Sequence, residues 1–170
     1  MPEHIPDFID PQSFAEKNRR IHGGLDLANL DRLSVELLDT AGRAEFELEF
    51  GREGRLIVVS GRVQAKLVLQ CQCCLGALVW PVQGTIRLGV ASSIDEANRL
   101  PEYLEPLMLS PGETVAVADL VQDELLLSIP VVPRHPDCHM AGVHAAPAPV
   151  TQAEKRNPFA ELANLQKNRT

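Results

Sequence analysis

The sequence AEFELEF (residues 44–50) alternates strictly between apolar and acidic side chains. In an extended chain, Phe46, Leu48 and Phe50 lie on one side and the three intervening glutamates lie on the other. This alternation predicts a strand with one buried face and one solvated face. The segment therefore indicates a sheet that packs against a core from one side.

The segments that follow continue this pattern with short connections. GREG (51–54) predicts a turn, RLIVVSG (55–61) predicts a strand, and GRVQAKLVLQ (61–70) alternates again. After a cysteine-rich turn, ALVWPVQGTIRLGV (77–90) continues in β fashion, with Pro81 marking an edge or a bulge. Because parallel strands need connections of about a dozen residues or more, the short connections predict antiparallel pairing.

Helices are predicted both before and after these strands along the chain. Four segments show helical spacing or residues typical of helix ends: PQSFAEKNRR (11–20), LANLDRL (27–33), SIDEANRL (93–100) and VADLVQDELLLSIP (117–130). Gly23 and Gly24 are expected to break the first helix, and Pro130 to end the last. Together the elements predict one α+β domain over residues 1–140, with a curved antiparallel sheet or a small barrel flanked by helices.

The C-terminal part differs in composition. Residues 141–155 are rich in alanine and proline and predict a flexible linker, followed by a short amphipathic helix within 156–170. The helix signals are a capping residue, a proline at the first helical position and an apolar stripe: Asn157, Pro158, Phe159, Leu162 and Leu165. Such a helix either docks on its own domain or recognises a partner.

Composition narrows the class of protein. The chain has 170 residues, of which 45% are hydrophobic, enough for one domain to bury a core unaided. The sequence contains no apolar run of about 20 residues that would span a membrane, and its acidic start lacks the features of a secretory signal. A cytoplasmic protein without membrane contact is expected, and its thiols should stay reduced.

The charge distribution is uneven. The net charge is −7, yet residues 51–90 carry five basic residues and one acidic residue. On the strand after Gly61, Arg62 and Lys66 share the face opposite the apolar side chains, and Arg87 belongs to the same basic section. This pattern is compatible with an ordinary solvated surface, and also with a local positive face that contacts RNA phosphates.

Two separated cysteine motifs suggest a metal site. Cys71 and Cys74 have C-x-x-C spacing in LQCQCCLGALV (69–79), and His135 and Cys138 have the same spacing in HPDC. Together they would supply the Cys₃His donor set of a closed structural zinc site. Small inert thiols and a redox pair remain alternatives, although a redox pair usually precedes a helix. Cys73 lies outside both motifs.

The two halves of this set are expected to converge. The turn at 71–74 follows a strand, and the corner after Pro130 and Pro133 follows a helix, so both terminate core elements and can lie at one end of the sheet. His135 is the expected fourth ligand, with His139 in reserve. Four protein ligands leave no open position for water, so the zinc would be structural.

Enzymatic motifs are absent from the sequence. It contains no phosphate-cradling GxxxxGK[ST], no G-x-S-x-G and no H-E-x-x-H. A non-enzymatic protein is therefore expected. The competing class is a thiol-based redox or metal-dependent enzyme that uses the cysteine cluster.

The order of these segments resembles a known family. HGGLDL, GRVQAKLVLQCQCCL, DLVQDELLLSIPVVPRHPDC and NPFAELANLQK are similar to motifs of the YceD family, the large ribosomal RNA subunit accumulation proteins of bacteria and plastids. The resemblance implies a role in accumulating 23S ribosomal RNA, with precursor 23S RNA, large-subunit ribosomal proteins or assembly factors as partners. A protein-only adaptor is an alternative.

The resemblance also bears on the cysteines. Cys71 and Cys74 match the family's cysteine pair, whereas Cys73 stands where the family usually has arginine, so any contact made by that arginine is absent here. Many relatives carry further cysteines after the proline-rich corner, as a zinc ribbon would, and others keep only part of the set. This pattern favours an ancestral metal site in the family.

Overall fold

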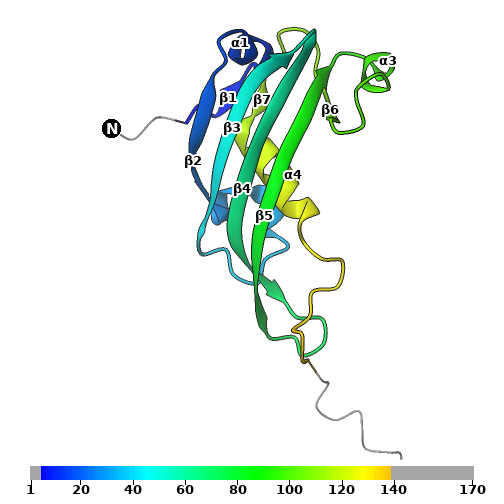
Figure 1. The fold of residues 1–170 in the computed structure, drawn as a ribbon. Coiled ribbons are helices and arrows are strands. Elements are labelled where there is room, and N and C mark those ends of the chain that lie inside the picture. The colour runs from blue at the N-terminus through cyan, green and yellow to red at the C-terminus, as the bar shows by residue number, and fades with distance from the viewer. Residues whose placement is uncertain (1–4, 139–170) are drawn as a thin grey trace, which may run out of the picture. The chain divides into compact units, whose positions relative to one another are not determined.

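A computed structural model describes residues 5–138 of the chain (Figure 1). In chain order the elements are β1 (Phe8–Ile9), α1 (Pro11–Glu16), β2 (Arg20–Asp26), the 3-10 turn η1 (Leu27–Asn29), α2 (Asp31–Ser34), β3 (Arg43–Glu53), β4 (Leu56–Gln70), β5 (Ala77–Ala91), α3 (Ile94–Ala97), β6 (Glu105–Met108), β7 (Val115–Ala116) and α4 (Val117–Leu127). The predicted linker (141–155) and C-terminal helix (156–170) lie outside the described residues. None of the helices within residues 5–138 is long and apolar enough to cross a membrane.

Five strands form the main sheet in the order β2-β3-β4-β5-β6 within the described part of the chain. The predicted antiparallel pairing is confirmed for β2 through β5, and β6 joins the end of β5 in parallel. The alternation in β3 has the predicted effect, since Phe46, Leu48 and Phe50 are all buried. Pro81 lies where β5 pairs only with β4, so this part of β5 is an edge, as predicted.

The small-barrel alternative is wrong, because the sheet is open. Between residues 5 and 138, β2 and β6 occupy opposite edges of the sheet and do not pair with each other. Closing a barrel requires the first and last strands to meet, and small closed barrels typically use about eight strands. Strand β6 is only four residues long and, among the described strands, pairs only with β5.

The predicted helix over residues 11–20 ends early. Helix α1 stops at Glu16, and Asn18 takes a left-handed conformation with φ of 45°. The chain then enters β2, where Gly23 and Gly24 pair with β3 rather than ending a helix. A side chain at Gly23 would collide with Ile5, so the glycine allows the N-terminal segment to cross the strand closely.

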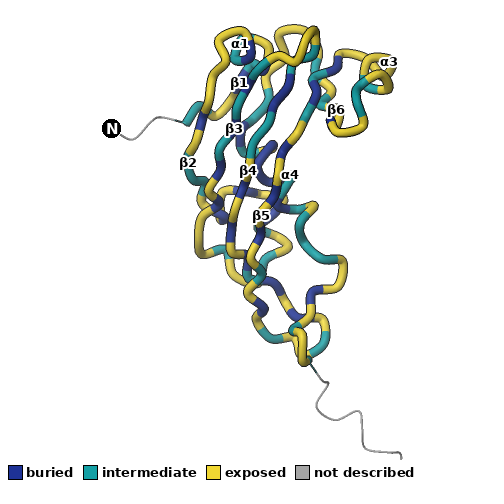
Figure 2. The backbone as a smooth tube through the Cα atoms, viewed as in Figure 1, coloured by how far each residue is buried: buried dark blue, intermediate teal, exposed yellow. Residues whose placement is uncertain are grey.

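Helix α4 covers one face of the sheet (Figure 1). Its buried residues Leu120, Val121 and Leu125 join a core cluster that includes Leu48 and Leu67 of the sheet. Figure 2 shows buried positions alternating along the strands, which leaves the opposite face of the sheet to solvent. This one-sided packing is typical of antiparallel sheets.

The segment after α4 returns to the far end of the β4–β5 hairpin. The indole Nε1–H of Trp80 on β5 donates to the carbonyl of Ser128 at 3.2 Å, which fixes the start of this segment. Five residues later, the carbonyl of Pro133 accepts a hydrogen bond from the amide of Gln72 at 2.8 Å. These contacts place residues 133–138 beside the cysteine turn. We call this region, residues 70–77 with 133–138, the hairpin tip.

Candidate metal centre

The C-x-x-C half of the site is a tight turn between β4 and β5. The amide of Cys71 donates to the Gly76 carbonyl at 2.9 Å, and the amide of Leu75 donates to the Cys71 carbonyl at 2.8 Å. Leu75 has φ of 60°, a left-handed conformation that non-glycine residues seldom adopt. This sharp reversal brings the thiols of Cys71 and Cys74 to the same side of the turn.

The H-x-x-C half is a second turn, packed beside the first. The amide of Cys138 donates to the His135 carbonyl at 3.2 Å, which closes the turn. The hydrogen bond between Gln72 and Pro133 ties this turn to the hairpin. Segments more than sixty residues apart in the sequence thereby become neighbours in space.

The donor atoms of Cys71, Cys74, His135 and Cys138 all lie within 4.8 Å of one another. The sulfur atoms of Cys71 and Cys138 are 3.7 Å apart, and the Cys74 sulfur lies 3.6 Å from Nδ1 of His135. A tetrahedral zinc ion with Zn–S bonds of about 2.3 Å and a Zn–N bond of about 2.0 Å separates two sulfurs by about 3.8 Å, and sulfur from nitrogen by about 3.5 Å. The four groups therefore suit a tetrahedral ion in number and type, and these two separations match its geometry.

The orientation of His135 also suits metal binding. Its Nε2 lies 3.1 Å from the carbonyl oxygen of Ala77. Because that oxygen can only accept a hydrogen bond, Nε2 carries the proton and Nδ1 keeps its lone pair, directed toward the Cys74 sulfur. Metal-binding histidines are commonly held in one tautomer by such a contact with a backbone carbonyl.

Hydrogen bonds and burial shift the pKa values of the Cys71 and Cys138 thiols in opposite directions. The backbone amides of Cys74, Cys73 and His135 donate to the Cys71 thiol and lower its pKa to about 5, against the opposing effect of burial. The pKa of Cys138 is instead raised, mainly by its hydrogen bond with the Cys73 thiol and by burial. Neighbouring thiols cannot all ionise unless a cation balances them, and a zinc ion would supply that balance.

Cys73 lies next to the site without belonging to its donor set. Its thiol is 3.4 Å from the carbonyl oxygen of Cys138, to which it donates a hydrogen bond. The four-residue donor set does not include it. Cys73 therefore supports the second turn from outside.

The structure thus brings together the four residues predicted to bind metal. The reserve ligand His139, along with Asn157, Pro158, Phe159 and Leu162, lies outside the described residues. Sequence patterns do not indicate the roles of the Ala77 carbonyl and of the amides around Cys71. Any residue type supplies these backbone groups, so no sequence signal marks them.

The predicted RNA-contact residues lie on the solvated face of the sheet, but their charges are largely engaged. Arg62 forms an ion pair with Glu47 of β3. Arg87 lies 3.7 Å from a Glu53 carboxylate oxygen, and its guanidinium stacks over the ring of Tyr103. Lys66 makes no ion pair with a residue of the described range.

Comparison with known proteins gives this arrangement a context. The family model described as large ribosomal RNA subunit accumulation protein YceD matches residues 59–166, a span that contains all four donors. The chain is also 29% identical over 171 residues to the large ribosomal RNA subunit accumulation protein YceD of Haemophilus influenzae, covering 95% of this chain and 96% of that protein. No solved structure matches the chain. On the family match, which extends over more than half of its length, this chain belongs to the YceD family of large ribosomal RNA subunit accumulation proteins.

Proposed function

We propose that this chain is a non-enzymatic assembly factor that promotes the accumulation of 23S ribosomal RNA in the cytoplasm. It would act by binding precursor 23S RNA or an assembly partner of the large subunit. The observation that carries the proposal is the family match over residues 59–166. The similarity to the Haemophilus influenzae protein along almost the full length of both chains supports it.

The metal centre would serve this function structurally. A zinc ion bound by Cys71, Cys74, His135 and Cys138 would have four protein ligands and no open position for a water or substrate molecule. Its role would be to join the segment after α4 to the β4–β5 hairpin and so fix the shape of the hairpin tip. A closed site of this kind favours a binding protein over a metal-dependent enzyme.

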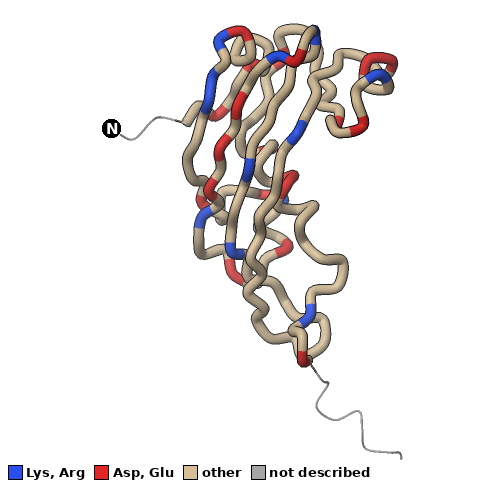
Figure 3. Tube along the Cα trace, viewed as in Figure 1, with Lys and Arg blue, Asp and Glu red and all other residues tan. Residues whose placement is uncertain are grey.

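The charge of the described residues bears on how a partner is bound. Residues 5–138 contain 12 basic and 20 acidic residues, a net charge of −8. Figure 3 shows the acidic positions of β3 lying between basic positions on β2 and β4. A general attraction to RNA through bulk charge is therefore disfavoured. Partner contacts should instead be local, on Arg62, Lys66 and Arg87 of the sheet face and on residues 156–170.

Sedimentation of cell extracts tests the proposal. An epitope-tagged chain should sediment with particles that contain precursor 23S RNA, because an assembly factor binds its particle before maturation is complete. The small ribosomal subunit in the same gradient is the internal control. Finding the chain only among free proteins, in cells that accumulate large-subunit precursors, would contradict the proposal.

A further inference from the structure

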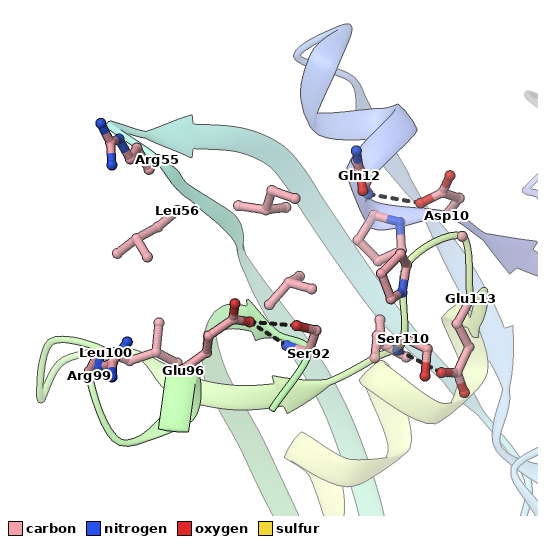
Figure 4. A pocket seen from close by; sticks show the side chains of 16 residues that line it. Asp10, Gln12, Arg55, Leu56, Ser92, Glu96, Arg99, Leu100, Ser110 and Glu113 are labelled. Carbon is pink, nitrogen blue, oxygen red and sulfur yellow. Dashed lines mark hydrogen bonds between the residues drawn. The ribbon is translucent and has the colours of Figure 1, made fainter. Parts of the chain in front are cut away.

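A pocket of about 400 Å³ is lined by elements at the end of the sheet remote from the hairpin tip (Figure 4). Its walls come from the start of β4, the end of β5, helix α3 and the loop after β6, with the start of α1 closing one side. This volume falls in the range of about 300–1,000 Å³ that is typical of ligand pockets.

Two arginines in this pocket have unused hydrogen-bond donors. Arg55 and Arg99 line the cavity, and the guanidinium group of neither makes a hydrogen bond or an ion pair within residues 5–138. The guanidinium of Arg19 lies over the Phe14 ring, and that of Arg134 donates to the Cys138 carbonyl. The remaining arginines of the described chain are paired with carboxylates: Arg20, Arg32, Arg43, Arg52, Arg62 and Arg87. Among the arginines of residues 5–138, Arg55 and Arg99 are therefore the two whose guanidinium groups contact no carboxylate, carbonyl or aromatic ring.

The acidic groups of the pocket are already engaged. A Glu96 oxygen accepts hydrogen bonds from the amide and hydroxyl of Ser92 at 2.8 and 2.7 Å. Glu113 accepts from the amide of Ser110 at 2.8 Å, and Asp10 accepts from an amide at the start of α1. Figure 4 shows the Glu96 and Glu113 side chains directed to these serines. These hydrogen bonds do not remove the charge of the carboxylates, and the pKa of Glu96 is lowered, mainly by its bonds from Ser92 and further by the charge of Arg99. The free donors that the pocket offers a ligand are therefore local, at the guanidinium groups of Arg55 and Arg99.

Apolar side chains form the rest of the wall. Leu56 and Leu100 lie between the two arginines in Figure 4, and Ile57, Val90 and Leu109 also line the cavity. A fitting ligand thus combines an anionic group that accepts several hydrogen bonds with a flat or compact apolar part. Arginine forks bind phosphate oxygens in pairs, which makes phosphate a suitable anion.

We propose that this pocket binds one nucleotide of a single-stranded RNA, with its phosphate on Arg55 and Arg99 and its sugar and base against Leu56 and Leu100. The inference rests on the proposed function, for which it names the direct ligand. It involves local recognition of a phosphate, so it does not require a basic domain. An acidic peptide segment would be the competing ligand, and the experiment below separates the two.

Binding of a fluorescein-labelled single-stranded RNA to the full-length protein tests this inference. Removing both cations in the double variant Arg55→Ala/Arg99→Ala should raise the dissociation constant by roughly tenfold or more, because a hydrogen bond to a charged group contributes about 1.5–3 kcal/mol. The plot of log K against log salt should have a slope of about −0.7 to −1.4 for one or two phosphate contacts, and a shallower slope in the variant.

The matched control is the double variant Arg20→Ala/Arg43→Ala. It removes the same charge from two arginines that are paired with Glu49 and Asp26, away from the pocket. RNA affinity should change by less than about threefold in this control. Equal melting temperatures for both variants and the parent would show that the loss is not due to unfolding, and Arg55→Lys should have intermediate affinity because lysine keeps the charge without the fork.

The inference would be overturned by equal RNA affinities of the pocket variant and the control. It would also be overturned if a peptide of glutamate and leucine bound the protein in an Arg55-dependent manner while the RNA did not bind. In either case the proposed function stands if loss of the chain still lowers 23S RNA in cells. Unchanged 23S RNA in cells lacking the chain would instead remove the proposed function, whatever the RNA affinity measured in vitro.

Discussion

Substituting Cys71 with serine is expected to abolish metal binding and to loosen the hairpin tip. The parent chain, purified without chelator, should contain about one zinc ion per molecule. Cys71 is fully buried, and three backbone amides direct hydrogen bonds to its thiol, so it is the thiolate most completely built into the site. Because zinc binding is coupled to folding of its ligand segments, its loss should lower the melting temperature by roughly 5–10 °C.

Elemental analysis measures the metal, and amide hydrogen exchange measures the tip. The amides of Cys71, Gln72 and Leu75 form hydrogen bonds within the tip and should exchange faster in the variant. Amides of β3 and β4 near Leu48 should keep their protection, since the main core lies away from the site. The expected loss of exchange protection is therefore large at the hairpin tip and small elsewhere in the domain.

Cys73→Ser is the matched control, because it removes a neighbouring thiol that is not in the donor set. This variant should retain about one zinc ion and nearly the parent melting temperature. Negligible zinc in the parent, together with only a modest effect of Cys71→Ser, would contradict the metal centre. The cluster would then be a set of packed thiols.

A chain that ends at residue 150 is expected to keep its fold and lose its association with ribosomal particles. The main core cluster is formed by residues between Ile9 and Leu125, so the melting temperature should change little. The family match nevertheless continues to residue 166, which includes NPFAELANL. We therefore expect the truncated chain to remain among free proteins in a sedimentation gradient.

The double variant Phe159→Ala/Leu162→Ala keeps the chain length and separates side-chain recognition from simple shortening. It should also lose most of the association, whereas Lys167→Ala, in the same segment but outside the apolar stripe, should keep it. A large fall in melting temperature on truncation would contradict this prediction. It would show that the segment docks on its own domain.

Much of the sheet could be predicted from local patterns. The alternation around Phe46 and Leu48 reports burial directly, and short turns require antiparallel pairing, so these features depend on nearby residues only. Gly23 and Gly24 do not end a helix but lie within β2, because glycine, which breaks isolated helices, also occurs in strands where a neighbouring segment crosses closely, as Ile5 does at Gly23. The open or closed state of the sheet was beyond local patterns, since it depends on whether β2 and β6 meet.

The two sites differ in how far sequence could anticipate them. The metal centre has rare residue types at regular spacing, so Cys71, Cys74, His135 and Cys138 could be named before their proximity was known. The nucleotide pocket has no such signature. An arginine in a sequence does not indicate whether a carboxylate neutralises it, because ion pairing depends on strand register and on loops from distant segments.

The ratio of 23S to 16S ribosomal RNA in cells lacking this chain tests its proposed function most directly. We expect the ratio to fall relative to growth-matched parent cells, to recover when the full-length chain is restored, and to stay low with the chain that ends at residue 150. An unchanged ratio in cells shown to lack the protein would contradict a role in accumulating 23S ribosomal RNA.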